Sequence, residues 1–252
     1  AGIDVPMFAN GWHPYAQNLR DFMNVVDLAG IDALHRNQLY YGDKPKYEDD
    51  YQWYLESLKM TLADTGIGYA AEMGSGYPTA SLQNAFRFAP KAEGYLYNYL
   101  LFMANGMKGW NWYTLVGRDG WACEAVDTFG RETAYAPAVR EAITVADTLG
   151  LPNLESTQNA ALITHKRHRY TDSGNWARVF NALLTADYDF TLCDPEQHNT
   201  DADLLFYGGA GWLPESVYKT LLEWIEAGKT LVCFGHYPAE DDVGHPLNLL
   251  EL

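Results

Sequence analysis

The sequence has few basic residues, few cysteines and no long apolar run, and each shortage argues against a class of protein. Lys and Arg number 17 against 33 Asp and Glu, so the net charge is −16 and no basic face for nucleic acid is expected. The three cysteines are odd in number and widely spaced, so neither a disulfide framework nor a CxxC metal site is predicted. No stretch approaches the roughly 20 apolar residues of a membrane span, and no signal peptide opens the chain. We therefore expect no nucleic-acid partner and no membrane, with the cytoplasm favoured over export.

Aromatic residues, in contrast, are abundant. They make up 14% of the chain, with 8 Trp and 18 Tyr. Such side chains fill protein cores and interfaces, and their flat faces also stack on the apolar faces of sugar rings. Composition alone leaves both roles open.

The first 150 residues alternate short apolar runs with helix-like stretches. The apolar runs cover 5–9, 31–34, 67–71 and 107–113, and helices are expected at 51–63, 92–105 and 136–149. This alternation predicts parallel βα units. Each run ends in polar or aromatic residues, which is where (β/α)₈ barrels carry their chemistry. Four such units make half a barrel, so 1–150 is predicted to be the C-terminal half of a TIM barrel.

A second α/β pattern begins after a short linker at 151–153. Strands are expected at 160–163, 190–193, 204–207 and 230–234, with helices at 176–185 and 214–227. The pattern predicts an open-sheet, Rossmann-like or flavodoxin-like domain over 151–252. Because the first strand is already under way at residue 1 and the last element is not closed, we expect the chain to be a fragment and this domain to be incomplete.

Glu72 is the first candidate catalytic residue. It follows a buried strand and precedes Gly74-Ser75-Gly76, where the backbone can turn sharply and let a ligand approach closely. A surface glutamate at a strand end would look similar. The position nevertheless favours a functional carboxylate.

A tryptophan-rich segment spans 109–121. Alternation along a strand puts Trp110 and Trp112 on one face, and Asn111 and Tyr113 on the other. One pair should face the interior of the barrel and the site, and the sequence leaves open which pair. Trp112, Tyr113 and Trp110 are therefore candidate substrate contacts, with a packed barrel wall as the alternative.

Four further polar or aromatic residues lie near strand ends. Arg118 and Asp119 could contact substrate or simply pair with each other, and Asn10 and Tyr40 could hold sugar hydroxyls or brace loops. The sequence shows no His, Asp or Glu set with convincing metal spacing, so neither a metal nor a cofactor is expected.

Two features of the second domain are read as structural. The glycine-rich segment 207–211 lies between a strand and a helix but matches neither phosphate-binding fingerprint, so no nucleotide site is predicted. Cys233 ends a strand without a glycine elbow, and we expect a buried structural thiol.

Taken together, the segments 71–78 and 111–119 resemble the nucleophile and last-strand segments of β-galactosidase-like glycoside hydrolases, families 35 and 42, and of related exo-β-glucosaminidases. Segment 5–10 looks like the fifth barrel strand and 30–32 like the sixth. The resemblance covers most of the chain. It implies a barrel followed by a glutaminase-like domain that has lost glutaminase chemistry and helps to build trimers.

The resemblance also implies roles for carboxylates. Glu72 would be the nucleophile of a retaining enzyme, at the end of strand seven, while the acid/base glutamate at the end of strand four would precede residue 1. Asp32, Asp119 and Glu124 do not sit where the family places its acid. The whole protein would be a retaining exo-β-glycosidase, with β-galactosidase as the favoured specificity, and this chain alone is expected to be inactive.

Two alternatives stay open. The first is an exo-β-D-glucosaminidase or another β-glycosidase on the same scaffold. The second is a non-catalytic carbohydrate-binding or assembly module. The partners expected from the resemblance are a carbohydrate substrate, the missing N-terminal half of the barrel, and further copies of the chain in a dimer or trimer.

Overall fold

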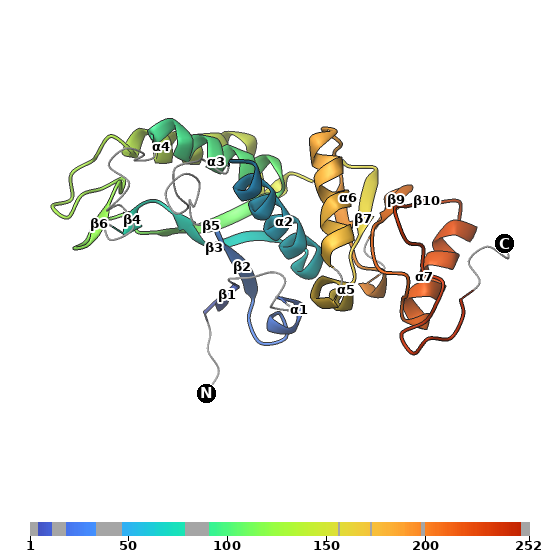
Figure 1. Cartoon of the computed structure of the whole chain (residues 1–252). Helices are drawn as coiled ribbons and strands as arrows, with labels where there is room; N and C mark the ends of the chain where they lie inside the picture. The colour runs from blue at the N-terminus through green and yellow to red at the C-terminus, as the bar shows by residue number, and fades with distance from the viewer. Residues whose placement is uncertain are drawn as a thin grey trace. The chain divides into compact units, whose positions relative to one another are not determined.

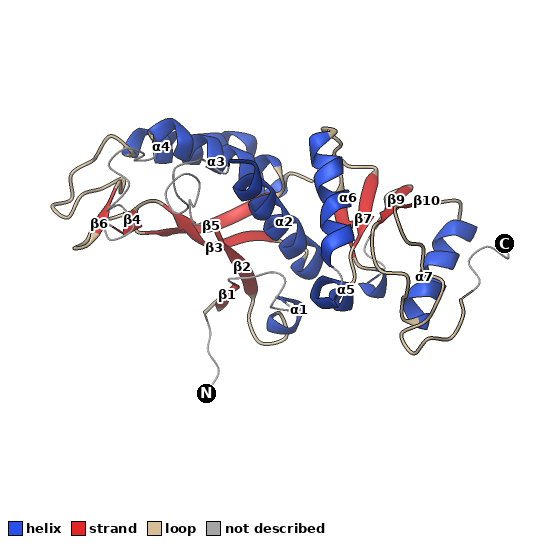
Figure 2. Ribbon diagram, in the orientation of Figure 1, coloured by secondary structure: helices blue, strands red, loops and turns tan. Residues whose placement is uncertain are grey.

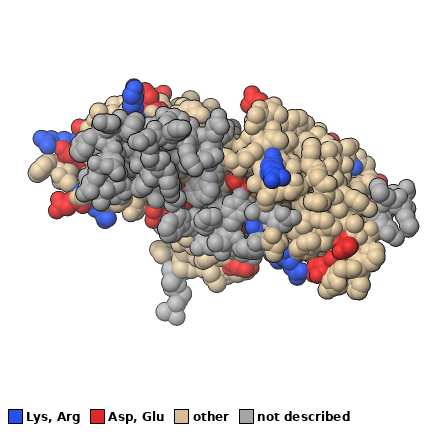
Figure 3. Space-filling model, viewed as in Figure 1, with Lys and Arg blue, Asp and Glu red and all other residues tan. Residues whose placement is uncertain are grey.

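The computed structural model describes residues 5–11, 19–33, 47–78, 91–155, 157–171, 173–197 and 200–247. The chain forms two compact units, Ala1–Glu155 and Ser156–Leu252, a few residues beyond the division predicted at 150. None of the helices in the described ranges is both long and apolar enough to cross a membrane. On the face drawn in Figure 3, the described Lys and Arg side chains lie singly and form no continuous patch.

The first unit alternates strands and helices (Figure 1). Its elements are β1 (Phe8–Gly11), α1 (Leu19–Phe22), β2 (Leu28–Ala33), α2 (Tyr47–Thr65), β3 (Gly68–Gly74), β4 (Tyr77–Pro78), α3 (Ala92–Ala104), β5 (Met107–Tyr113), β6 (Trp121–Ala122) and α4 (Ala136–Leu149). The strands predicted from apolar runs and the helices predicted from periodicity are confirmed, with shifts at their ends. Gly150 ends α4 as expected, since its φ of 61° is a conformation that glycine adopts without strain.

Four of these strands form one parallel sheet in the order β1-β2-β3-β5. Helices lie along one face of it, with α3 and α4 above the strands in Figure 2. On that face, Ile31 and Met73 of the strands are buried in the same hydrophobic cluster as Leu58 of α2 and Tyr99 and Phe102 of α3. Burial of these apolar side chains is the main stabilising term of the unit.

The second face of the sheet carries the side chains that alternate with the core residues. By alternation and strand register, the positions on this face include Phe8, Asn10, Gly30, Asp32, Tyr69, Glu72, Gly109, Asn111 and Tyr113. Phe8 is 52% exposed and Asn111 is also exposed. A small antiparallel ribbon, in which Tyr77 pairs with Ala122, follows the carboxyl ends of β3 and β5.

The second unit is an open sheet of four parallel strands in the order β10-β9-β7-β8. Its elements are β7 (Ala160–Ile163), α5 (Lys166–Thr171), α6 (Ser173–Thr185), β8 (Thr191–Cys193), β9 (Leu204–Tyr207), α7 (Glu215–Glu226) and β10 (Thr230–Cys233). Leu221 and Trp224 of α7 are buried in a cluster with Leu205 and Ile163 of the strands. The four strands and two long helices predicted for this region are confirmed.

All three cysteines are free thiols. Cys193 is buried at the end of β8, as a small apolar residue would be. The prediction that Cys233 is buried is wrong, because Cys233 ends an edge strand and is exposed.

Candidate active site

Glu72 lies at a β-bulge within β3. From Ala70 to Met73 the strand advances three residues while β5 advances two, and from Ala70 to Glu72 it advances two while β2 advances one. In a regular strand, residues 70 and 72 would share a face, and Glu72 would point into the core that holds Ala70. The bulge instead puts Ala70 and Met73 in the core and turns Glu72 to the second face.

The Glu72 carboxylate has a hydrogen-bond donor on that face. Asn10 Nδ2 donates to Glu72 Oε1 at 2.9 Å. Partial burial raises the pKa of Glu72 above its ordinary value, and the bond from Asn10 lowers it by less. A carboxylate that is partly removed from water, yet still held by a donor, is suited to nucleophilic or acid/base chemistry.

Aromatic rings line the second face toward the amino ends of the strands. The Tyr69 ring meets the Phe8 ring edge to face, with centroids 6.0 Å apart. Glycines flank Tyr69 on both neighbouring strands. A Cβ at Gly30 would lie 2.6 Å from the Tyr69 ring, and one at Gly109 would lie 3.7 Å from it. The two glycines therefore make room for this ring.

At the carboxyl ends of the strands, β3 and β5 are joined by a backbone bond from Ser75 N to the Tyr113 carbonyl oxygen, 2.9 Å. Thr114 follows with φ of 60°, an unfavourable conformation for a β-branched residue. The Tyr113 ring packs edge to face on Trp121, and the Arg118 guanidinium lies 5.3 Å from the centre of the Trp121 ring. Backbone strain next to an aromatic cluster is common where a ligand binds.

The two tryptophans of β5 lie on the helix-covered face. Trp112 meets Tyr99 edge to face with centroids 4.9 Å apart, and Trp110 packs against Trp112 at 5.5 Å. Both are partly buried against the core cluster. Of the two alternating pairs, Asn111 and Tyr113 thus share the second face with Glu72. Contact of Trp110 or Trp112 with a sugar stays a prediction.

The remaining candidates are dispersed. Asp32 pairs in register with Glu72 from the neighbouring strand and lies on the same face. Asp119 is exposed in the segment after β5. Glu124 lies next to Gly117, and its Oε2 is buried. Tyr40 lies outside the described residues. Among the residues that the structure describes, no group of His, Cys, Asp and Glu could hold a metal ion.

Two residues of this region were not among the sequence candidates. Asn111 donates through Nδ2 to the carbonyl oxygen of Ala71 at 3.3 Å, within the bulge. Trp121 connects Tyr113 to Arg118. Alternation along β5 could have singled out Asn111 once Tyr113 was chosen, whereas the position of Trp121 depends on the β4–β6 ribbon.

Glu72→Gln is expected to stabilise the protein slightly at pH 7. The pKa of Glu72 is higher in the folded protein than its ordinary value of 4.5. Glu72 therefore stabilises the fold at a pH below 4.5, and this contribution is lost as the pH rises through the folded pKa. A neutral amide avoids this loss, and the gain is on the order of a few tenths of a kcal/mol for a partly buried group. Urea unfolding at pH 7 and pH 4 checks it, since the gain should vanish at pH 4. The control Glu93→Gln, in the first turn of α3, should not stabilise.

A second polar cluster lies at the carboxyl ends of β7 and β8 in the other unit. His165 is buried, and its Nε2 is 3.3 Å from Glu196 Oε1, while Lys166 Nζ is 3.0 Å from Glu196 Oε2. Burial lowers the pKa of His165, although Glu196 and Asp194 oppose the shift. Burial would raise the pKa of Glu196, but its bonds to Lys166 and His165 lower it overall. Such an arrangement is typical of a structural ion pair.

This cluster makes the second unit sensitive to acid. A histidine whose folded pKa is depressed destabilises the fold as pH falls below the ordinary value of 6.5, because the unfolded chain then binds the proton more readily. We expect the melting temperature of the unit to fall between pH 7 and pH 5, and His165→Gln to flatten that fall. Thermal unfolding followed by circular dichroism checks it. The same change at the exposed His236 should leave the slope as it is.

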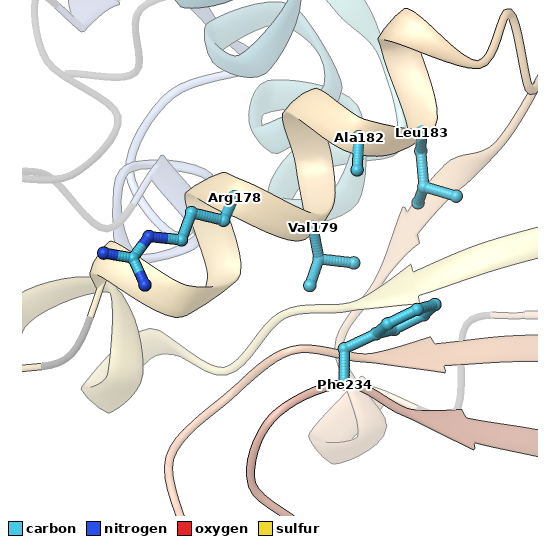
Figure 4. Close-up of a pocket in the computed structure, with 5 residues that line it drawn as sticks. All are labelled: Arg178, Val179, Ala182, Leu183 and Phe234. Carbon is cyan, nitrogen blue, oxygen red and sulfur yellow. The ribbon is translucent and has the colours of Figure 1, made fainter.

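The second unit also has a small apolar hollow of about 230 Å³. Arg178, Val179, Ala182 and Leu183 of α6 line it together with Phe234, and Val179 points toward the Phe234 ring in Figure 4. The volume lies below the roughly 300 Å³ at which small-molecule pockets begin. It brings no polar groups together, so Glu72 and its neighbours remain the better candidate.

The sequence matches no protein-family model and no curated protein. Solved structures with a similar fold include glycoside hydrolases. A catalytic mutant of Gan42B, a GH42 β-galactosidase from G. stearothermophilus, is 12% identical with a TM-score of 0.71, over 96% of this chain and 39% of that one. The apo exo-carrageenase GH42 from Bacteroides ovatus is 12% identical with a TM-score of 0.64, over 92% and 34%. The exo-β-1,4-mannosidase Op5Man5 from Opitutaceae bacterium strain TAV5 is 15% identical with a TM-score of 0.57, over 84% and 41%.

These likenesses concern the fold, since identities this low carry no statement about activity. The chain spans about two fifths of the length of the Gan42B and Op5Man5 chains and about a third of the exo-carrageenase chain. Its architecture, α/β with two parallel sheets, matches part of the fold of these structures.

Proposed function

We propose that residues 1–150 are the C-terminal half of the barrel of a retaining exo-β-glycosidase, and that 151–252 form a Rossmann-like, glutaminase-type domain without glutaminase chemistry. The observation that carries the proposal is the setting of Glu72. Its carboxylate stands at a bulge near the carboxyl end of a parallel strand, on the face opposite the helices, and accepts a bond from Asn10. Barrel enzymes place catalytic groups at this end of their strands.

In this proposal Glu72 is the nucleophile. Its carboxylate attacks the anomeric carbon, a glycosyl–enzyme ester forms, and the bond to the leaving oxygen breaks as a second carboxylic acid protonates that oxygen. Water then attacks the ester, gives its proton to the second group, and releases the sugar with retained configuration. The second carboxyl group, about 5–5.5 Å away in such enzymes, belongs to the half of the barrel outside this chain.

The proposal requires partners for both edges of the sheet. β1 and β5 are the outer strands of the four that the structure describes. Further parallel strands of the whole protein would pair with these edges and cover Phe8, and their absence would leave an aggregation-prone edge. The chain expressed alone should therefore be inactive and poorly soluble. The second unit would support a dimer or trimer of the whole protein.

A β-galactoside is the first substrate we propose. An amino sugar, as in exo-β-D-glucosaminidases, is the second, and Asp32 favours it. Asp32 pairs with Glu72 from the neighbouring strand, so the two acidic residues share one face of the sheet. Such a pair would attract the ammonium group of a 2-amino sugar. Asp32→Asn should then lower kcat/KM for a glucosaminide more than for a galactoside.

The function is tested by assaying the protein with its complete barrel against aryl β-galactosides, β-glucosaminides and β-mannosides. We expect turnover of at least one of them, and proton NMR of the first product should show retained β-configuration. Inversion would contradict the nucleophile role of Glu72. Binding of sugars without turnover of any substrate would favour the non-catalytic carbohydrate-binding module.

A further inference from the structure

Asn10 reaches Glu72 across an intervening strand. Asn10 is on β1 and Glu72 on β3, and β2 lies between them. The residue of β2 that pairs with Asn10 is Gly30, which has no side chain on the second face. The amide of Asn10 can therefore extend over β2 and donate to Glu72 Oε1 at 2.9 Å. A Cβ at position 30 would lie 2.6 Å from the Tyr69 ring and 2.6 Å from the Tyr69 carbonyl oxygen, so a larger residue there would displace the part of β3 that carries Glu72.

The backbone that carries Glu72 is fixed from the other side. At the bulge, Ala71 has no partner in the register between β3 and β5. Its carbonyl oxygen instead accepts a hydrogen bond of 3.3 Å from Nδ2 of Asn111, which belongs to β5. The Tyr99 hydroxyl of α3 donates to the Gly74 carbonyl oxygen at 3.0 Å, close to the end of the same strand. With its backbone held at these points, the carboxylate of Glu72 is directed toward Asn10.

We infer that Asn10 is a positioning residue, which orients the Glu72 carboxylate and favours its ionised form. A neutral amide that donates to a carboxylate stabilises the charged state without adding a competing charge. Two other ionisable groups lie close by on the flanking strands. Asp32 of β2 pairs with Glu72, and Tyr113 of β5 pairs with Gly74, two residues further along β3. Burial opposes ionisation of Glu72, and the donor from Asn10 offsets part of that effect. The inference rests on the proposed function only for its effect on catalysis.

The test measures the ionisation of Glu72 in the protein with its complete barrel. The side-chain carboxyl resonances are monitored by ¹³C NMR as the pH is changed, and the Glu72 resonance is assigned by its absence in Glu72→Gln. Three variants are compared with the parent. Asn10→Ala removes the donor. Asn10→Asp keeps the shape and replaces the donor by a second carboxylate. Asn105→Ala removes a side-chain bond of similar length, 2.9 Å to the Leu101 carbonyl oxygen at the end of α3, and serves as the matched control.

The pKa of Glu72 is expected to rise in Asn10→Ala and to rise further in Asn10→Asp, where the two carboxyls titrate together. It should be unchanged in Asn105→Ala. The acid limb of the pH profile of kcat/KM should move upward in the same order, and kcat at pH 7 should fall about tenfold in Asn10→Ala with little change in KM. An unmoved Glu72 titration in both Asn10 variants would overturn the inference.

The Glu72 titration and the turnover of Glu72→Ala together separate this inference from the proposed function. If the Glu72 pKa moves as expected but Glu72→Ala keeps full turnover, Asn10 does position the carboxylate and the nucleophile assignment is wrong. If Glu72→Ala abolishes turnover but Asn10→Asp leaves the Glu72 pKa unchanged, the function stands and the role given to Asn10 is wrong.

Discussion

Glu72→Ala, in the protein with its complete barrel, is expected to lower kcat for aryl β-glycosides by about 10⁴-fold. Without the carboxylate no glycosyl ester can form, and the side chain that replaces it leaves a space on the same side of the sugar. Azide should fit that space and attack the anomeric carbon. Turnover should return with azide, and the product should be a glycosyl azide of inverted configuration.

The rescue distinguishes loss of the nucleophile from loss of the fold. Glu93→Ala removes an exposed carboxylate on α3 and should leave kcat unchanged with or without azide. Near-normal turnover in Glu72→Ala, or a loss that azide does not restore in a folded protein, would contradict the assignment.

Gly30→Ala is expected to destabilise the first unit by about 2–3 kcal/mol. A Cβ at this position would lie 2.6 Å from the Tyr69 carbonyl oxygen and 2.9 Å from Ala71 N, so the backbone of β3 would have to move. Those atoms lie at the bulge that directs Glu72. The same substitution should therefore also disturb the carboxylate, and kcat should fall along with the free energy of unfolding in urea.

Gly94→Ala is the matched control for this substitution. Gly94 lies in α3, where an added Cβ would meet nothing within 4 Å. Alanine is the better helix former, so a gain of about 0.5–1 kcal/mol is expected there. Equal effects of the two alanines, in either direction, would mean that close approach of β2 to β3 is not what requires glycine at position 30.

Much of the architecture could be predicted because it is encoded locally. The buried strands are short runs of apolar residues, and α4 begins with a proline in its first turn and ends at Gly150. Glu72 was found for a local reason too, since it follows such a run and precedes Gly74-Ser75-Gly76. Hydrophobic periodicity and the residues that begin or end a helix or strand act within a few residues of the chain.

The direction of the side chains at the site could not be predicted in the same way. Alternation alone would turn Glu72 toward the core, and the bulge that reverses it involves pairing with both neighbouring strands. The bond from Asn10 joins residues that are 62 positions apart. Which face of β5 carries Tyr113 depends on where Tyr99 of α3 meets Trp112, and no local pattern encodes that contact.

Covalent trapping tests the role of Glu72 most directly. The protein with its complete barrel is treated with a 2-deoxy-2-fluoro-β-glycosyl fluoride of the sugar that it hydrolyses, digested, and examined by tandem mass spectrometry. We predict inactivation in time and one glycosylated peptide, with the sugar attached to Glu72. Attachment to another carboxylate, such as Asp32 or Asp119, or full inactivation without any labelled peptide, would contradict the role proposed for Glu72.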